Sequence, residues 1–135
     1  MVGSLAGRAP LQGAATYAAT KAGLRAFVLS LADELHGSGI HVGIVSPGPI
    51  DTGFIMDEID KVEDVVYSQP MSTAQEVADA IVKLASGNAV EIPMPWLSGK
   101  LTTLSYLFPR LRRTLRPLFN KIGAIKKNKY RRKKH

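Results

Sequence analysis

Helix-forming residues dominate the first quarter of the chain. Between Ala14 and His36, apolar side chains recur every three or four residues, a period that places them on one face of a helix. The run Gly37-Ser38-Gly39 follows, and glycine adopts the left-handed conformation that commonly ends helices. We therefore predict a helix over residues 14–36, with this apolar face: Tyr17, Leu24, Phe27, Val28, Leu31 and Leu35.

A strand is predicted on each side of this helix. β-Branched residues fill residues 40–48 until Pro47 and Gly48 end the run, and residues 1–7 (MVGSLAG) are typical of a strand end that turns into a loop. A helix joined by a short glycine turn to an apolar strand is half of a βαβ unit. The pattern therefore predicts an α/β fold with a parallel sheet.

A second helix is predicted over residues 73–86. Ser72 and Gln75 have the spacing of a capping box, Gly87 follows as a stop, and the apolar stripe comprises Val77, Ile81, Val82 and Leu84. Residues 89–94 resemble one more short strand. Residues 52–70, between the first strand and this helix, are predicted to hold a short helix or a mobile lid.

Charge divides the chain into two parts. The net charge is +7, but residues 1–108 carry −5, whereas residues 109–135 hold twelve Lys and Arg and no acidic residue. Pro109 is expected to bend or break any continuous helix here, and residues 121–135 look too charged to pack. We predict a partial α/β domain over residues 1–95 and a helical to disordered basic extension over residues 96–135.

Composition excludes several classes of site. The chain has no cysteine, which removes disulfides and thiol chemistry, and its three histidines are too scattered to suggest a metal site. No apolar run approaches the ~20 residues that a membrane-spanning helix needs.

Three residues near the start have side chains suited to proton transfer. Tyr17 and Lys21 lie one turn apart on the predicted helix, so the ammonium group can stabilise the tyrosine as a phenolate. Ser4, at a strand end, could donate a hydrogen bond to a substrate carbonyl oxygen while Tyr17 gives or takes the proton. Together these roles describe reversible carbonyl reduction.

The Tyr-x-x-x-Lys spacing alone is a weak signal, since Tyr130 and Lys134 repeat it in the basic tail. Only the Tyr17 copy has a serine thirteen residues before it and a strand ending in Pro-Gly after it. With this context the chain resembles the short-chain dehydrogenase/reductase family over about residues 1–90. The resemblance rests on Ser-x12-Tyr-x3-Lys, YAATKAGL and GIHVGIVSPGPIDT.

The resemblance implies roles for these residues. Tyr17 would be the catalytic acid and base, Lys21 would assist it and bind the nicotinamide ribose, and Ser4 would orient the substrate. Residues of the Pro-Gly loop would contact the nicotinamide end of NAD(P), with NADP slightly favoured over NAD: Pro47, Gly48, Ile50 and Thr52. The substrate would be a small carbonyl compound or alcohol, and a homo-oligomer would be expected of the whole enzyme.

The chain departs from the family at its start. It has no Gly-x-x-x-Gly-x-Gly turn, no Asn-Asn-Ala-Gly segment and no asparagine before Ser4. We therefore expect the C-terminal, catalytic half of a doubly wound (Rossmann-like) parallel sheet, without the half that binds the dinucleotide phosphates.

A second hypothesis assigns the function to residues 96–135. Aromatic residues beside an arginine-rich stretch suit a non-enzymatic module that binds an anionic membrane surface. A solvated extension is the simpler alternative, and nucleic acid binding is not expected because no recognition motif is present. The predicted location is cytoplasmic, with membrane association through the tail.

Overall fold

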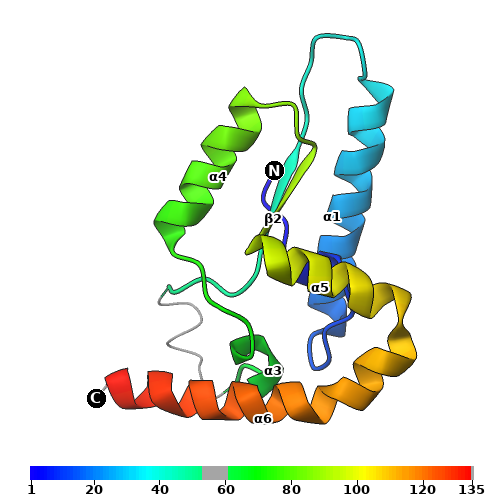
Figure 1. The fold of residues 1–135 in the computed structure, drawn as a ribbon. Coiled ribbons are helices and arrows are strands. Elements are labelled where there is room, and N and C mark those ends of the chain that lie inside the picture. Colours follow the sequence, from blue (N-terminus) through cyan, green and yellow to red (C-terminus); the bar gives the residue numbers. More distant parts are fainter. Residues whose placement is uncertain (53–60, 135) are drawn as a thin grey trace.

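A short parallel sheet forms the centre of the molecule (Figure 1). The computed structural model describes residues 1–52 and 61–134. Strand β1 (Ile44–Pro47) pairs in parallel with β2 (Glu91–Met94), with Val45 opposite Ile92. On the other side of β1, Val2 makes a parallel bridge to Val45. The predicted α/β class with a parallel sheet is confirmed.

Helix α1 (Ala15–Glu34) confirms the first predicted helix. Val28 on this helix is fully buried, whereas its neighbour Phe27 is 56% exposed. Gly37 and Gly39 both have positive φ, at 80° and 82°, as the glycine turn requires. The strand that follows begins only at Ile44, later than the predicted start at residue 40, and Ile40 is 61% exposed.

The N-cap of helix α4 (Ala74–Ser86) is one residue later than the predicted cap, Ser72. Thr73 is the N-cap: its hydroxyl accepts from the Glu76 N–H, and the Glu76 carboxylate accepts from the Thr73 N–H at 2.7 Å. Ser72 cannot take this role because its backbone pairs with Ile50. The predicted stripe is wrong at two positions, since Ile81 and Val82 are exposed and the buried residues are Val77, Ala80 and Leu84.

The core lies between α4 and the sheet. Val45, Ala80 and Leu84 form a buried cluster against which Ile92 and Met94 pack. This contact explains why the predicted strand over residues 89–94 forms: β2 supplies the second parallel partner of β1 and covers the same cluster. Sheet and helix thus bury one apolar layer on one face.

Two helices follow the sheet. Helix α5 (Trp96–Leu107) leads to α6 (Pro109–Lys134) through Phe108, whose φ of −119° and ψ of 73° are not helical. The predicted break at Pro109 is therefore confirmed. No helix of the described segments is long and apolar enough to cross a bilayer.

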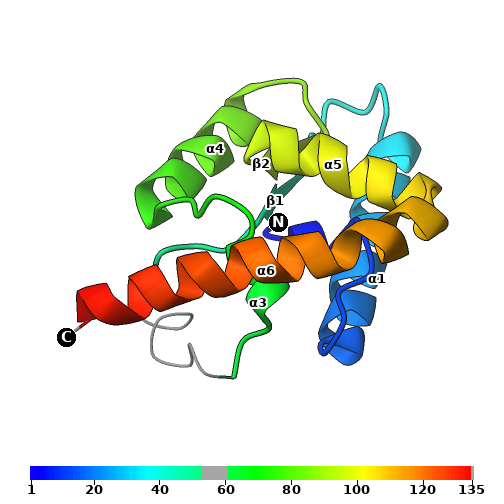
Figure 2. The same ribbon diagram turned by 60° about the horizontal axis from the view of Figure 1, so that its bottom comes forward.

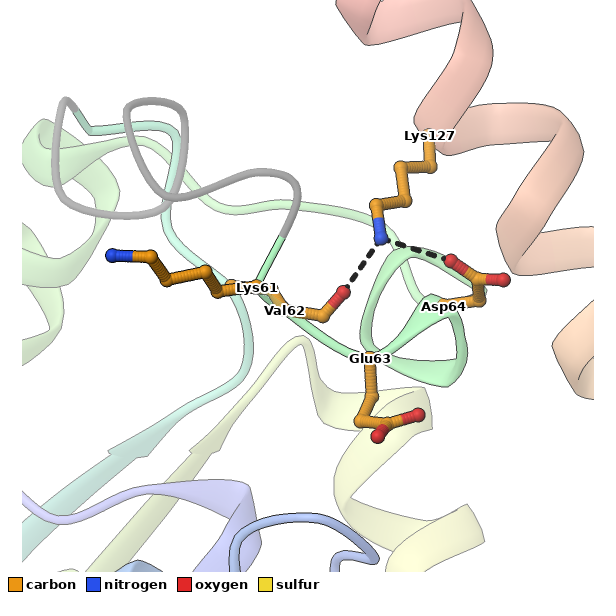
Figure 3. Close-up of a pocket in the computed structure, with 5 residues that line it drawn as sticks. All are labelled: Lys61, Val62, Glu63, Asp64 and Lys127. Carbon is orange, nitrogen blue, oxygen red and sulfur yellow. Dashed lines mark hydrogen bonds and ion pairs between the residues drawn. The ribbon is translucent and has the colours of Figure 1, made fainter.

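The prediction that residues 121–135 are too charged to pack is wrong for the described part of this segment. Helix α6 lies against α3 (Asp64–Tyr67), a short helix within the segment predicted as a helix or lid, of which residues 53–60 lie outside the described residues (Figure 2). Lys127 Nζ donates to the Val62 carbonyl at 2.8 Å and to Asp64 Oδ1 at 3.0 Å (Figure 3). Lysine ammonium groups thus serve as hydrogen-bond donors to α3 and its flanks instead of remaining in solvent.

Candidate functional site

Two of the predicted site segments, Ser4 and the Pro-Gly loop, lie at the carboxyl ends of neighbouring parallel segments. The Gly3 N–H donates to the Val45 carbonyl at 2.7 Å, so Ser4 follows directly on a strand-like segment beside β1. Pro47 and Gly48 lie at the end of β1, and a Cβ on Gly48 would be 3.2 Å from Leu5 Cδ1. The loop that begins at Ser4 (the serine loop, residues 4–8) is therefore a neighbour of the Pro-Gly loop. Both lie at the edge of the sheet where α/β folds bind ligands.

Ser4 occupies the N-cap of a 3₁₀ turn, η1 (Leu5–Gly7). Its hydroxyl oxygen accepts a hydrogen bond from the Ala6 N–H at 3.1 Å, which fixes the position of the oxygen. A hydroxyl can donate while it accepts. The Ser4 proton can therefore still be given to a substrate oxygen.

Tyr17 and Lys21 share one face of α1. The Lys21 Nζ atom lies 5.7 Å from the centre of the Tyr17 ring and 3.5 Å from the Val2 carbonyl oxygen. The lysine therefore lies between the tyrosine and the strand segment that precedes Ser4. Tyr17 is 47% exposed, so the described part of the chain does not enclose its side chain.

Gly7 holds the serine loop against α1. A Cβ at this position would lie 2.7 Å from the Lys21 carbonyl carbon, closer than real Cβ contacts come. Only glycine allows this approach of the η1 backbone to the α1 backbone at Lys21. The sequence prediction did not include Gly7, although a glycine three residues after Ser4 was the available signal.

We expect Gly7→Val to destabilise the protein by about 1–3 kcal/mol, because the loop must move away from α1. Urea denaturation measures this loss. Gly23→Val is the matched control, because Gly23 lies on α1, the helix that Gly7 approaches, and a Cβ there has nothing within 4 Å. Equal stability of Gly7→Val and the unmodified chain would contradict the close packing.

After the predicted cofactor-binding residues Pro47 and Gly48, the chain runs away from the end of β1. The Gly48 N–H donates to the Met94 carbonyl at 2.7 Å, and Pro47 is buried. Ile50 pairs with Ser72, and the Thr52 N–H donates to the Ile50 carbonyl at 2.8 Å. The loop thus joins the end of β1 to the segment before α4, with Ile50 and Thr52 beyond the point where Gly48 meets Leu5.

A partly buried ionic cluster was missed by the sequence prediction. The Glu91 carboxylate accepts hydrogen bonds from Arg25 on α1 at 2.8–3.1 Å and from Ser46 on β1 at 2.9 Å. It also forms an ion pair with Arg8, which follows η1. Glu91 therefore connects the serine loop, the Tyr17 helix and the strand that ends in Pro47.

Electrostatics keep this carboxylate ionised. Burial by itself raises the pKa of Glu91, but hydrogen bonds from Arg25, Arg8 and Ser46 outweigh burial and lower that pKa to about 2. The hydrogen bond to Glu91 raises the pKa of Arg25 in turn. Both partners are charged at neutral pH.

The pocket drawn in Figure 3 is separate from these residues. It has a volume of about 160 Å³ and is lined by Lys61, Val62, Glu63, Asp64 and Lys127. None of the predicted site residues lines it. Among the described residues, no group of three acidic or histidine side chains could hold a metal ion.

Comparison with known proteins identifies the family. A family profile described as "Enoyl-(Acyl carrier protein) reductase" matches residues 1–94, which include Ser4, Tyr17, Lys21 and both strands. The chain belongs to the short-chain dehydrogenase/reductase family. The family match provides no support for the alternative of a non-enzymatic module.

Individual relatives agree with this assignment. "3-oxoacyl-[acyl-carrier-protein] reductase FabG" of Escherichia coli is 39% identical over 95 residues, covering 67% of this chain and 39% of that protein. "Uncharacterized oxidoreductase YjdA" of Bacillus subtilis is 37% identical over 93 residues, covering 68% and 35%. The chain thus spans less than two fifths of the length of these relatives.

A third relative resembles more of the chain. An "Uncharacterized oxidoreductase" of Myxococcus xanthus is 31% identical over 122 residues, which is 88% of this chain and 42% of that protein. Because this match covers 88% of the chain, it must continue beyond residue 94. The aligned region therefore includes α5 and part of α6, so the similarity to this relative extends beyond the residues that the family profile matches.

Proposed function

We propose that this chain carries the proton-transfer and nicotinamide-end part of an oxidoreductase that interconverts a carbonyl compound and an alcohol. The supporting observation is the placement of Tyr17 and Lys21 on one face of α1, beside the strand that leads to Ser4. The relatives' names point the same way.

The residues present fit the nicotinamide end of NAD(P). The Lys21 ammonium group has three donors for ribose hydroxyls, and Gly48, which has no side chain, follows buried Pro47 at the strand end. When bound, the dinucleotide supplies or accepts the hydride. Nothing in residues 1–52 or 61–134 forms the Gly-rich turn that holds dinucleotide phosphates.

Each site residue then has one task. In the direction of reduction, the Ser4 hydroxyl donates to the substrate carbonyl oxygen and fixes its position. Tyr17 gives its phenolic proton to the same oxygen as the carbonyl carbon receives hydride, and the C=O bond becomes C–OH. The Lys21 ammonium stabilises the phenolate that remains, and this phenolate takes a proton back from solvent.

The names of relatives suggest the first substrates to test. Several relatives are named as 3-oxoacyl-[acyl-carrier-protein] reductases. We therefore propose 3-oxoacyl thioesters as the first substrate class, followed by simple ketones. NADPH is the cofactor that we propose to test first, as expected from the family resemblance, followed by NADH.

The longest natural form of the protein should oxidise NADPH or NADH only when a carbonyl substrate is present, as nicotinamide absorbance will show. Ser4→Ala should lower kcat by about 10²–10³-fold, the usual cost of losing one donor to the substrate oxygen. Ser38→Ala, in the exposed turn after α1, is the control. Failure to oxidise either cofactor with every carbonyl class would refute the proposal.

A further inference from the structure

An apolar stripe runs along α6 and is not used by the fold. Its members recur every three or four residues, which places them on one helix face. Leu111, Leu118 and Ile125 are 46%, 54% and 72% exposed. Leu115 and Ile122 lie between them and are partly exposed. Near the junction with α5, Tyr106 and Phe108 are 65% and 53% exposed.

A different face of α6 holds the helix on the protein. Gly123 is buried, and a Cβ there would clash with the Asp64 backbone. Lys127 bonds to Val62 and Asp64, and the ring centre of Tyr130 lies 6.2 Å from that of Tyr67. The helical period of about 3.6 residues places these contacting residues on a face beside the stripe, not on the stripe itself. Docking on α3 therefore leaves the stripe exposed, on a helix that runs along the lower edge of the molecule in Figure 1.

Charge determines what can cover the stripe. Helix α6 carries twelve Lys and Arg, and the sequence has no acidic residue after Glu91. Lys121 flanks the stripe and Lys129 continues its line four residues beyond Ile125, both exposed. A second copy of α6 on this face would bring like charges together without any acidic partner. The occupant must therefore be anionic.

We propose that α6 binds the surface of an anionic lipid bilayer through this stripe. A helix with leucine and isoleucine on one face, aromatic residues at its end and basic flanks is suited to lie in the headgroup region. Each lysine close to the surface adds attraction to anionic lipid. The proposal stands whether or not the oxidoreductase assignment is correct, because it depends only on α6 and the adjoining end of α5.

The test is co-sedimentation of the full chain with phosphatidylcholine vesicles, with and without phosphatidylserine. We expect binding only to the vesicles that contain phosphatidylserine. Leu118→Ser with Ile125→Ser should weaken binding at least about tenfold, since the apolar burial is lost. Val82→Ser is the matched control, because Val82 is an apolar residue of α4 that is 67% exposed.

A second pair of variants tests the orientation of the helix. The double variant with Lys121→Gln and Lys129→Gln should weaken binding roughly 30-fold, because each charge at the surface contributes about fivefold to the affinity. Arg113→Gln with Arg116→Gln removes the same charge from the side of α6 away from the stripe. These two positions are farther from the lipid, and screening should limit the effect to a few-fold.

Three results would overturn the proposal. The first is no binding to anionic vesicles, and the second is equal binding to neutral ones. The third is a dimer that Leu118→Ser with Ile125→Ser dissociates, since the stripe would then bind a second copy. Far-ultraviolet circular dichroism of each variant ensures that a loss of binding is not a loss of helix.

Discussion

Tyr17→Phe should lower carbonyl reduction by about 10²–10⁴-fold while dinucleotide affinity changes little. The phenolic proton is the one that the proposed reaction transfers, and a phenylalanine ring keeps the volume and the Lys21 contact without that proton. The measurement is kcat together with the Kd for NADPH in the longest natural form of the protein.

The chain provides a matched control for this variant. Tyr130 also has a lysine four residues later, but it packs against Tyr67 on α3 instead of facing a strand end. Tyr130→Phe should therefore leave kcat unchanged. Wild-type turnover in Tyr17→Phe, or an equal loss in both variants, would show that Tyr17 does not carry the proton.

Glu91→Gln should lower the free energy of unfolding by about 2–4 kcal/mol at neutral pH. The substitution keeps the size of the side chain but leaves Arg8 and Arg25 without a counter-charge, and removing one partner of a partly buried ion pair costs somewhat less than the ~3–5 kcal/mol of a fully buried one. The measurement is urea denaturation. Glu34→Gln, at the exposed end of α1, should change stability by less than about 0.5 kcal/mol.

The effect of Glu91 should depend on pH with a definite sign. Its pKa is about 2 in the folded protein, against an ordinary 4.5, so the unfolded chain binds the proton more readily. The stabilisation is complete above pH 4.5 and is lost as pH falls towards 2. The difference between wild type and Glu91→Gln should therefore shrink over this range. A difference that stays constant down to pH 2 would contradict the assigned ion pairs.

Local signals in the sequence predicted the elements that they control. The helix over residues 14–36 and its glycine stop depend on neighbours in sequence, and both formed. The cap of α4 was ambiguous because Ser72 with Gln75 and Thr73 with Glu76 have the same spacing. Only the pairing of Ser72 with Ile50, a long-range contact, decides between them.

Long-range contacts explain what the sequence did not predict. Glu91 meets Arg25 across 66 positions, and no local pattern indicates such a pair. The charge of residues 121–135 favoured solvent, but Gly123 permits close packing and Lys126 Nζ donates to the Ser68 carbonyl at 3.0 Å. At the site, the Tyr17 and Lys21 geometry follows from helix spacing, whereas the approach of Leu5 to Gly48 does not.

The carboxylate of Glu91 is shared by donors from three separate segments, and this sharing constrains how the sequence can evolve. Losing Glu91 leaves two arginines uncompensated, and losing either arginine removes one of the donors that keep Glu91 ionised. Substitutions at residues in one such network are non-additive by about 0.5–3 kcal/mol. Glu91, Arg8 and Arg25 should therefore be replaced together across relatives, as one inherited unit, and a homologue that retains only one of the three should be rare.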